Sequence, residues 1–119
     1  MHGQTHTGIW NDERATLKEW LADAQLEGQQ DTYASKRQYP RVTWAVPVTL
    51  ELLDGPRVGK CDFAVSKDIS EGGIGVRCHR ALVLRTLVRI LIDECGPSVH
   101  ARVTHCTETV GGFIIGVEF

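Results

Sequence analysis

Apolar residues recur at helical spacing in the first quarter of the chain. The stripe consists of Trp10, Leu17, Leu21, Ala24 and Gly28, with Trp20 beside it. A period near 3.6 predicts an amphipathic helix, which Asn11 or Asp12 can cap. Residues 1–10 offer mostly small and polar side chains, so we expect them to be loose. The stripe is expected to dock on the rest of the protein, to pair with a second copy, or to bind a partner protein.

From residue 42 onward the apolar period changes to two, which is typical of half-buried strands. The first strand spans 42–52, and its apolar phase is Val42, Trp44, Val46, Val48, Leu50 and Leu52. A turn at 54–56 follows. The second strand spans about 58–70, and we expect its inward phase to be Cys61, Phe63, Val65 and Ile69.

Four further strands complete this pattern. They are expected at 74–78, 86–93, 99–104 and 113–119, with turn signals at 71–73, 95–97 and 111–112. Short strands at regular intervals, with no crossover helix between them, favour an antiparallel barrel. The predicted fold is all-β, a six-stranded antiparallel barrel with an added N-terminal α-helix.

Composition places the chain among ordinary globular domains. Its 119 residues suit one domain, with 42% apolar and 24% charged residues. A net charge of -2 provides no overall basic field for a nucleic-acid polymer. There is no apolar run long enough for a membrane span and no secretory signal, so we expect a cytoplasmic location. Four cysteines without a C-x-x-C pair are then expected as reduced thiols, with two disulfides as the alternative for a secreted chain.

Two arginines stand four residues apart just before the first strand. A guanidinium matches phosphate oxygens and also the O6/N7 edge of guanine, so Arg37 and Arg41 are candidate ligand-binding residues. Pro40 disfavours helix at Tyr39, so the segment should be extended or turned. The arginines can then contact different parts of one ligand, and Lys36 adds a third positive charge.

A second candidate site lies where the second strand ends. If Phe63 points inward, alternation directs Asp68 and Ser70 outward on the same side. The carboxylate can accept hydrogen bonds from guanine N1–H and its amino group, and the hydroxyl can donate to a phosphate. Gly72 and Gly73 permit a turn with positive φ and the close approach of a flat ring. Solvated surface arginines and an ordinary turn are the alternatives.

These two motifs together resemble those of PilZ domains. Arg37-x-x-x-Arg41 is similar to the R-x-x-x-R element of that family, and Asp68-x-Ser70-x-x-Gly73 is similar to its D/N-x-S-x-x-G element. The segment 115–119, Ile-Gly-Val-Glu-Phe, resembles the last strand of many PilZ barrels. The resemblance covers residues 36–119 as a PilZ β-barrel domain and leaves 1–35 as an N-terminal tail and helix.

The resemblance implies a receptor for the bacterial second messenger cyclic di-GMP, with no other cofactor. It implies that Arg37 and Arg41 hold phosphates and guanine edges, while Asp68 and Ser70 hold the opposite guanine edge and Gly73 allows close approach. We further expect the nucleotide to order residues 29–41 and to move the N-terminal helix. This change would signal to a downstream protein partner, and a homodimer is also compatible with the sequence.

Other function classes have less support. The five histidines form no H-E-x-x-H grouping, no G-x-S-x-G or P-loop is present, and Asp68 and Ser70 lack a nearby base, so we do not expect an enzyme. Zinc at Cys78-His79 or His105-Cys106 is disfavoured, because neighbours on a strand face opposite ways. The main alternative is a PilZ-like protein–protein adaptor that binds no nucleotide. A small-barrel nucleic-acid binder would need a basic, aromatic-rich face.

Overall fold

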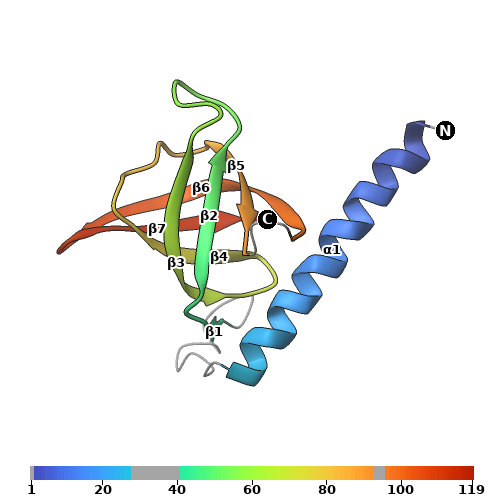
Figure 1. Cartoon of the computed structure of the whole chain (residues 1–119), viewed down its shortest axis with the longest axis horizontal. Coiled ribbons are helices and arrows are strands. Elements are labelled where there is room, and N and C mark those ends of the chain that lie inside the picture. The colour runs from blue at the N-terminus through green and yellow to red at the C-terminus, as the bar shows by residue number, and fades with distance from the viewer. Residues whose placement is uncertain (1, 28–40, 93–95) are drawn as a thin grey trace.

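The computed structural model describes residues 2–27, 41–92 and 96–119, with side chains from residue 13 onward. Its elements are α1 (His2–Glu27), β1 (Val42–Thr43), β2 (Pro47–Leu52), β3 (Cys61–Ile69), β4 (Gly73–Cys78), β5 (Leu87–Leu91), β6 (Ser98–Thr109) and β7 (Gly112–Glu118). All strand pairs are antiparallel. Neighbouring strands follow the order β3-β2-β5-β6-β7-β4, and pairing of β4 with β3 closes the barrel (Figure 1). The predicted six-stranded barrel with an N-terminal helix is confirmed.

The barrel interior is filled by one phase of each strand. The most deeply buried apolar side chains are Leu50, Ile69, Val76, Val88, Ile90, Val99, Val103 and Ile115. The apolar phase predicted for the first strand is also correct, since Trp44, Val48 and Leu52 are buried. Burial of about eight such side chains, at about 1.5–3 kcal/mol each, is the main favourable contribution to barrel stability.

The phase predicted for the first part of β3 is wrong. Phe63 is 71% exposed and Val65 is 46% exposed, and Cys61 also lies on the outer surface. The inward positions are instead Ala64 and Ser66. Two large apolar side chains therefore remain on the outside of the barrel.

A β-bulge explains why alternation failed along β3. The register shifts between Ser66 and Asp68, so the strand changes phase and Ile69 is buried as predicted. The buried Ser66 hydroxyl also bridges the gap between β1 and β2, because it donates to the Trp44 carbonyl and accepts a 2.9 Å hydrogen bond from the Val46 amide. This single side chain satisfies backbone groups that the ladder leaves unpaired.

The helix is longer than the sequence predicted. It begins at His2, so the expectation that residues 1–10 are loose is wrong from residue 2 onward. No proline interrupts the segment, and a helix that has been nucleated extends at little cost per residue. In the described part of the chain, no helix has the length and hydropathy needed to cross a membrane.

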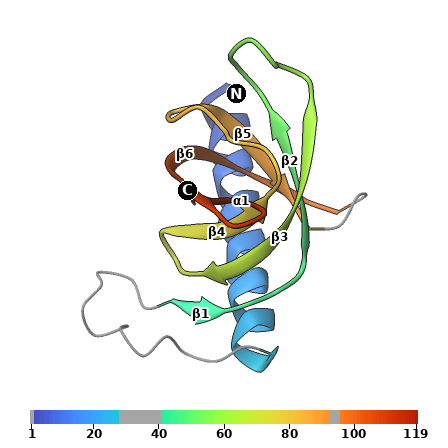
Figure 2. The same cartoon turned by 90° about the vertical axis from the view of Figure 1, so that its left-hand side faces the viewer.

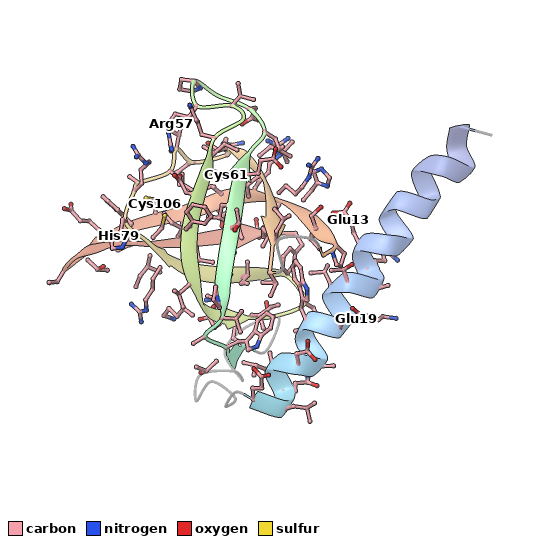
Figure 3. All side chains as sticks on the ribbon, viewed as in Figure 1. Glu13, Glu19, Arg57, Cys61, His79 and Cys106 are labelled. Atoms are coloured by element: carbon pink, nitrogen blue, oxygen red, sulfur yellow. The ribbon has the colours of Figure 1, made fainter. Side chains whose placement is uncertain are left out.

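The C-terminal half of α1 docks on the barrel beside β1 and β6 (Figures 1 and 2). The contact residues Thr16, Trp20 and Ala24 are buried, so Trp20 lies in the middle of the docking face and not beside it. Glu13 adds a polar contact: its carboxylate accepts a 2.6 Å hydrogen bond from the His100 amide and lies 3.2 Å from Nδ1 of the same residue (Figure 3). The predicted docking of the helix is therefore confirmed.

An ion pair between the buried Asp62 and the partly exposed Arg57 holds the start of β3, at the opposite end of this strand from Asp68. Asp62 accepts two hydrogen bonds, at 2.9 and 2.8 Å, from the guanidinium of Arg57 (Figure 3). A second guanidinium, that of Arg80, lies 3.5 Å away. These hydrogen bonds lower the pKa of Asp62 below its ordinary value, against the opposing effect of burial.

Candidate functional site

A groove of about 740 Å³ runs along the outer surface of the barrel beside β4, β6 and β7. Its lining includes every predicted site residue that the structure describes: Arg41, Asp68, Ser70, Gly72 and Gly73. Two separate sequence motifs therefore meet at one surface. The remaining predicted residues, Lys36 and Arg37, lie outside the described part of the chain.

Asp68 carries the buried carboxylate of the groove. Its neighbour across the strand pair is Thr43, which brings the preceding Arg41 alongside. Arg41 Nη1 lies 3.7 Å from Asp68 Oδ2, and Lys67 Nζ lies 2.9 Å from the same oxygen. Because Asp68 is only 6% exposed, these two cations compensate the charge of a carboxylate that has lost most of its hydration.

The second carboxylate oxygen of Asp68 faces the floor of the groove. Asp68 pairs with Gly75, and a Cβ added to this glycine would lie 2.8 Å from Asp68 Oδ1. Gly75 in turn pairs with Gly116, which pairs with His105 on β6. Two neighbouring strands thus contribute glycines to the floor, where the Asp68 side chain covers Gly75, which is buried, and Gly116 is half-buried.

The sequence motifs did not assign Gly75, Gly116 or His105 to the site. The available signal was glycine inside strand-like patterns, at 75 in Ile-Gly-Val and at 116 in a second Ile-Gly-Val. Isolated glycine in a strand often marks the close approach of a ligand or of another backbone. The role of these positions depends on pairing between strands that are distant in sequence, which a single motif does not encode.

Ser70 has a structural role in the turn between β3 and β4. Its hydroxyl accepts a 3.2 Å hydrogen bond from the Gly72 amide, and its own amide donates a 2.9 Å bond to the Gly73 carbonyl. This is the ordinary Ser turn that the sequence left open as an alternative. The turn fixes the rim of the groove beside Asp68.

The sequence predicted a positive φ at the two glycines of the β3–β4 turn, and this prediction is wrong. Neither Gly72 nor Gly73 has a positive φ. A Cβ at Gly73 would instead collide with the carbonyl oxygen of Val117 on β7. Glycine is needed at this position because two backbones approach closely, and not because of turn geometry.

Comparison with known families agrees with this architecture. The PilZ domain family model matches residues 35–119. The chain belongs to the PilZ domain family. PilZ domains form a receptor family of the cyclic di-GMP-binding type. No curated protein is significantly similar to the chain.

The charge balance of this PilZ groove is informative. Its described lining contains two permanent cations, Arg41 and Lys67, and three carboxylates, Asp68, Glu71 and Glu118. This surface alone provides no excess of positive charge for an anionic ligand. A ligand with two phosphates therefore requires further cations, and the chain supplies Lys36 and Arg37 immediately upstream of Arg41.

Proposed function

We propose that the protein is a non-enzymatic receptor that binds cyclic di-GMP in the groove beside β4. The donor edge of one guanine would meet Asp68, while Arg37, Arg41 and Lys36 would contact phosphates and guanine acceptors. The observation that carries the proposal is the contact between Arg41 and Asp68 at the edge of a groove with a glycine floor. Family membership agrees with a ligand of this class.

The two oxygens of Asp68 can serve different tasks. Oδ2 contacts both Lys67 and Arg41, whereas Oδ1 faces the Gly75 floor and makes no hydrogen bond with any residue in the described ranges. A guanine can therefore donate to Oδ1 without displacing the lysine. Hydrogen bonds to a carboxylate contribute roughly 1.5–3 kcal/mol each, and more reliably where water is excluded.

The size of the groove also supports a nucleotide ligand. Sites for small molecules usually have volumes of about 300–1,000 Å³, and the groove has about 740 Å³. Arg41 lines the groove, and the upstream arginine segment directly precedes it in the sequence. Residues 36 and 37 would then cover the ligand and add the positive charge that the lining lacks.

The proposed output passes through the N-terminal helix. The segment 28–40 joins α1 directly to Arg41, and α1 packs on β1, which follows Arg41. A ligand that fixes Arg37 and Arg41 would change the position of α1 and expose or cover a surface for a downstream protein.

Isothermal titration calorimetry with cyclic di-GMP tests the proposed function. The wild-type protein should bind, and Asp68→Asn should weaken binding by roughly 10- to 150-fold because it removes a charged acceptor. Glu108→Gln is the matched control, since this exposed carboxylate on β6 does not line the groove. The receptor assignment would be rejected if cyclic di-GMP produced no binding heat and did not compete with any guanine nucleotide for the protein.

A protein–protein adaptor is the second candidate. The specific observation in its favour is the exposure of Phe63 and Val65 on the outer face of β3. Apolar side chains that remain outside a barrel are typical of partner surfaces when they cluster. The adaptor would bind no nucleotide, and the same calorimetric titration separates the two candidates.

A further inference from the structure

Two β-bulges direct side chains into the groove from its opposite sides. In β3 the register shifts between Ser66 and Asp68, and in β6 it shifts between Val103 and His105. Ser66 and Val103 point into the barrel and are almost fully buried. Two residues later, simple alternation would direct Asp68 and His105 inward as well. Both instead line the groove on the outside of the barrel, where Asp68 is buried and His105 is exposed, because each bulge changes the phase of its strand.

Asp68 and His105 stand at the two ends of one row across four strands. Between them lie Gly75 and Gly116, paired with each other and each paired with one end residue. With a spacing of about 4.8 Å between strands, three intervals separate the end Cα atoms by roughly 14 Å. The middle of the row has no side chains, so the floor between carboxylate and imidazole is backbone.

Both end side chains lean over this floor. Asp68 Oδ1 lies 2.8 Å from where a Cβ of Gly75 would stand, and His105 Cδ2 lies 3.0 Å from where a Cβ of Gly116 would stand. The bulge residue Thr104 fixes the β6 side, because its hydroxyl donates a 3.2 Å hydrogen bond to the Gly116 carbonyl. A carboxylate over the buried Gly75 and an aromatic ring over the half-buried Gly116 thus lie side by side along the row.

A flat base that stands on this floor meets chemically different groups on its two sides. The carboxylate offers acceptors to ring N–H and amino donors, while the imidazole offers a π surface. Bases commonly stack on aromatic side chains, histidine included, when proteins bind unpaired nucleotides. His105 is exposed and lines the groove, so its side chain is accessible to a ligand.

We propose that His105 is the base-stacking residue of the site and holds the purine whose donor edge meets Asp68. This inference rests on the proposed function, and it adds a residue from β6 to a site whose described members include Arg41, Asp68 and the β3–β4 turn. His105 would thereby bring β6 into contact with the ligand.

Calorimetry with cyclic di-GMP on three His105 variants tests the assignment. His105→Ala should weaken binding by roughly 5- to 150-fold, the range that loss of one base–aromatic stack produces. His105→Gln keeps a polar side chain without a ring and should behave like alanine, whereas His105→Phe should stay within about threefold of wild type. His79→Ala is the control, because this histidine is exposed beside the β6–β7 hairpin and does not line the groove (Figure 3).

A spectroscopic measurement separates stacking from a purely structural role. In the wild-type protein, ring-proton NMR signals of His105 should move upfield on saturation with the nucleotide, while those of His79 should stay in place. Unchanged affinity in His105→Ala, or a loss in His105→Phe as large as in alanine, would overturn the stacking role and leave the receptor function standing. No binding to the wild-type protein would instead reject the receptor function, and the stacking role with it.

Discussion

Arg41 Nη1 lies 3.7 Å from Oδ2 of Asp68, although the two residues belong to motifs 27 positions apart in the chain. The contact follows from antiparallel pairing of β1 with β3, in which Thr43 lies opposite Asp68. It brings a group suited to phosphates next to a group suited to guanine donors. The same pair therefore defines where the proposed ligand would lie.

Arg41→Ala should separate ligand binding from stability. We expect a loss of roughly 2–4 kcal/mol in the free energy of cyclic di-GMP binding, because charge-assisted contacts are removed. Stability should change by less than about 1 kcal/mol, since the Arg41 side chain is 41% exposed and partly exposed ion pairs contribute little. Calorimetry and urea denaturation measure the two effects. Arg14→Ala, at an exposed helix position, should leave both unchanged.

Gly73→Ala and Gly75→Ala should have opposite consequences. At Gly73 the new Cβ meets the backbone of β7, which cannot move freely, so we expect a destabilisation of roughly 1–3 kcal/mol. At Gly75 it meets only the end of the Asp68 side chain, which can rotate away, so the fold should persist while nucleotide affinity falls. Thermal denaturation and calorimetry of both variants check the contrast. Equal losses of stability in the two variants would show that Gly75 is needed for the fold and has no separate role in nucleotide binding.

Asp62 should make stability depend on pH in the acid range. Its pKa is lowered from 3.8 in the fold, chiefly by hydrogen bonds from Arg57, so the folded state favours the ionised form. This contribution is fully present above pH 3.8 and is lost as the pH falls through the lower folded-state pKa. Asp62→Asn should cost about 1–3 kcal/mol at neutral pH.

The free-energy difference between Asp62→Asn and wild type should shrink below pH 3.8, because the wild-type carboxylate is then protonated in the unfolded chain. Urea denaturation at a series of pH values measures it. The exposed Glu108→Gln provides a reference for carboxylates without an ion pair. A difference that stays constant down to the lowest pH would contradict the role of the ionised group.

Nucleotide binding should slow amide hydrogen exchange across residues 29–41, because Arg37 and Arg41 would contact the ligand. Mass spectrometry with and without cyclic di-GMP measures this directly. Asp68→Asn at the same nucleotide concentration should show little slowing. Unchanged exchange in a saturated wild-type protein would rule out an output that passes through this segment.

Periodicity was sufficient to predict the barrel and its added helix. The alternating runs around Val48, Val76 and Val103 gave correct inward phases, because burial on one face of a strand imposes a period of two. The same rule failed at Phe63 and Val65, since it assumes uninterrupted strands and β3 contains a bulge. Asp68 and Ser70 are buried, but both line the groove, because Ile69 lies beyond the bulge and points inward.

The candidate site could be predicted only in part for a related reason. Asp68 and Arg41 belong to local motifs, and the structure brings them together. Gly75, Gly116 and His105 enter the groove through pairing of β4, β7 and β6, which depends on the closed barrel. The phase of His105 also depends on a bulge, so neither its spacing nor its residue type indicated an outward position.

The docking of α1 has a mechanical consequence. The described side chains that attach it to the barrel begin at Glu13 and lie mainly around Trp20, while the helix continues back to His2 (Figure 1). The 11 helical residues before Glu13 extend roughly 16 Å beyond this contact at about 1.5 Å per residue. A tilt of only about 10° at Glu13 would move the N-terminal end of the helix by roughly 3 Å. Small rearrangements next to the groove would thus be amplified at the far end of the molecule.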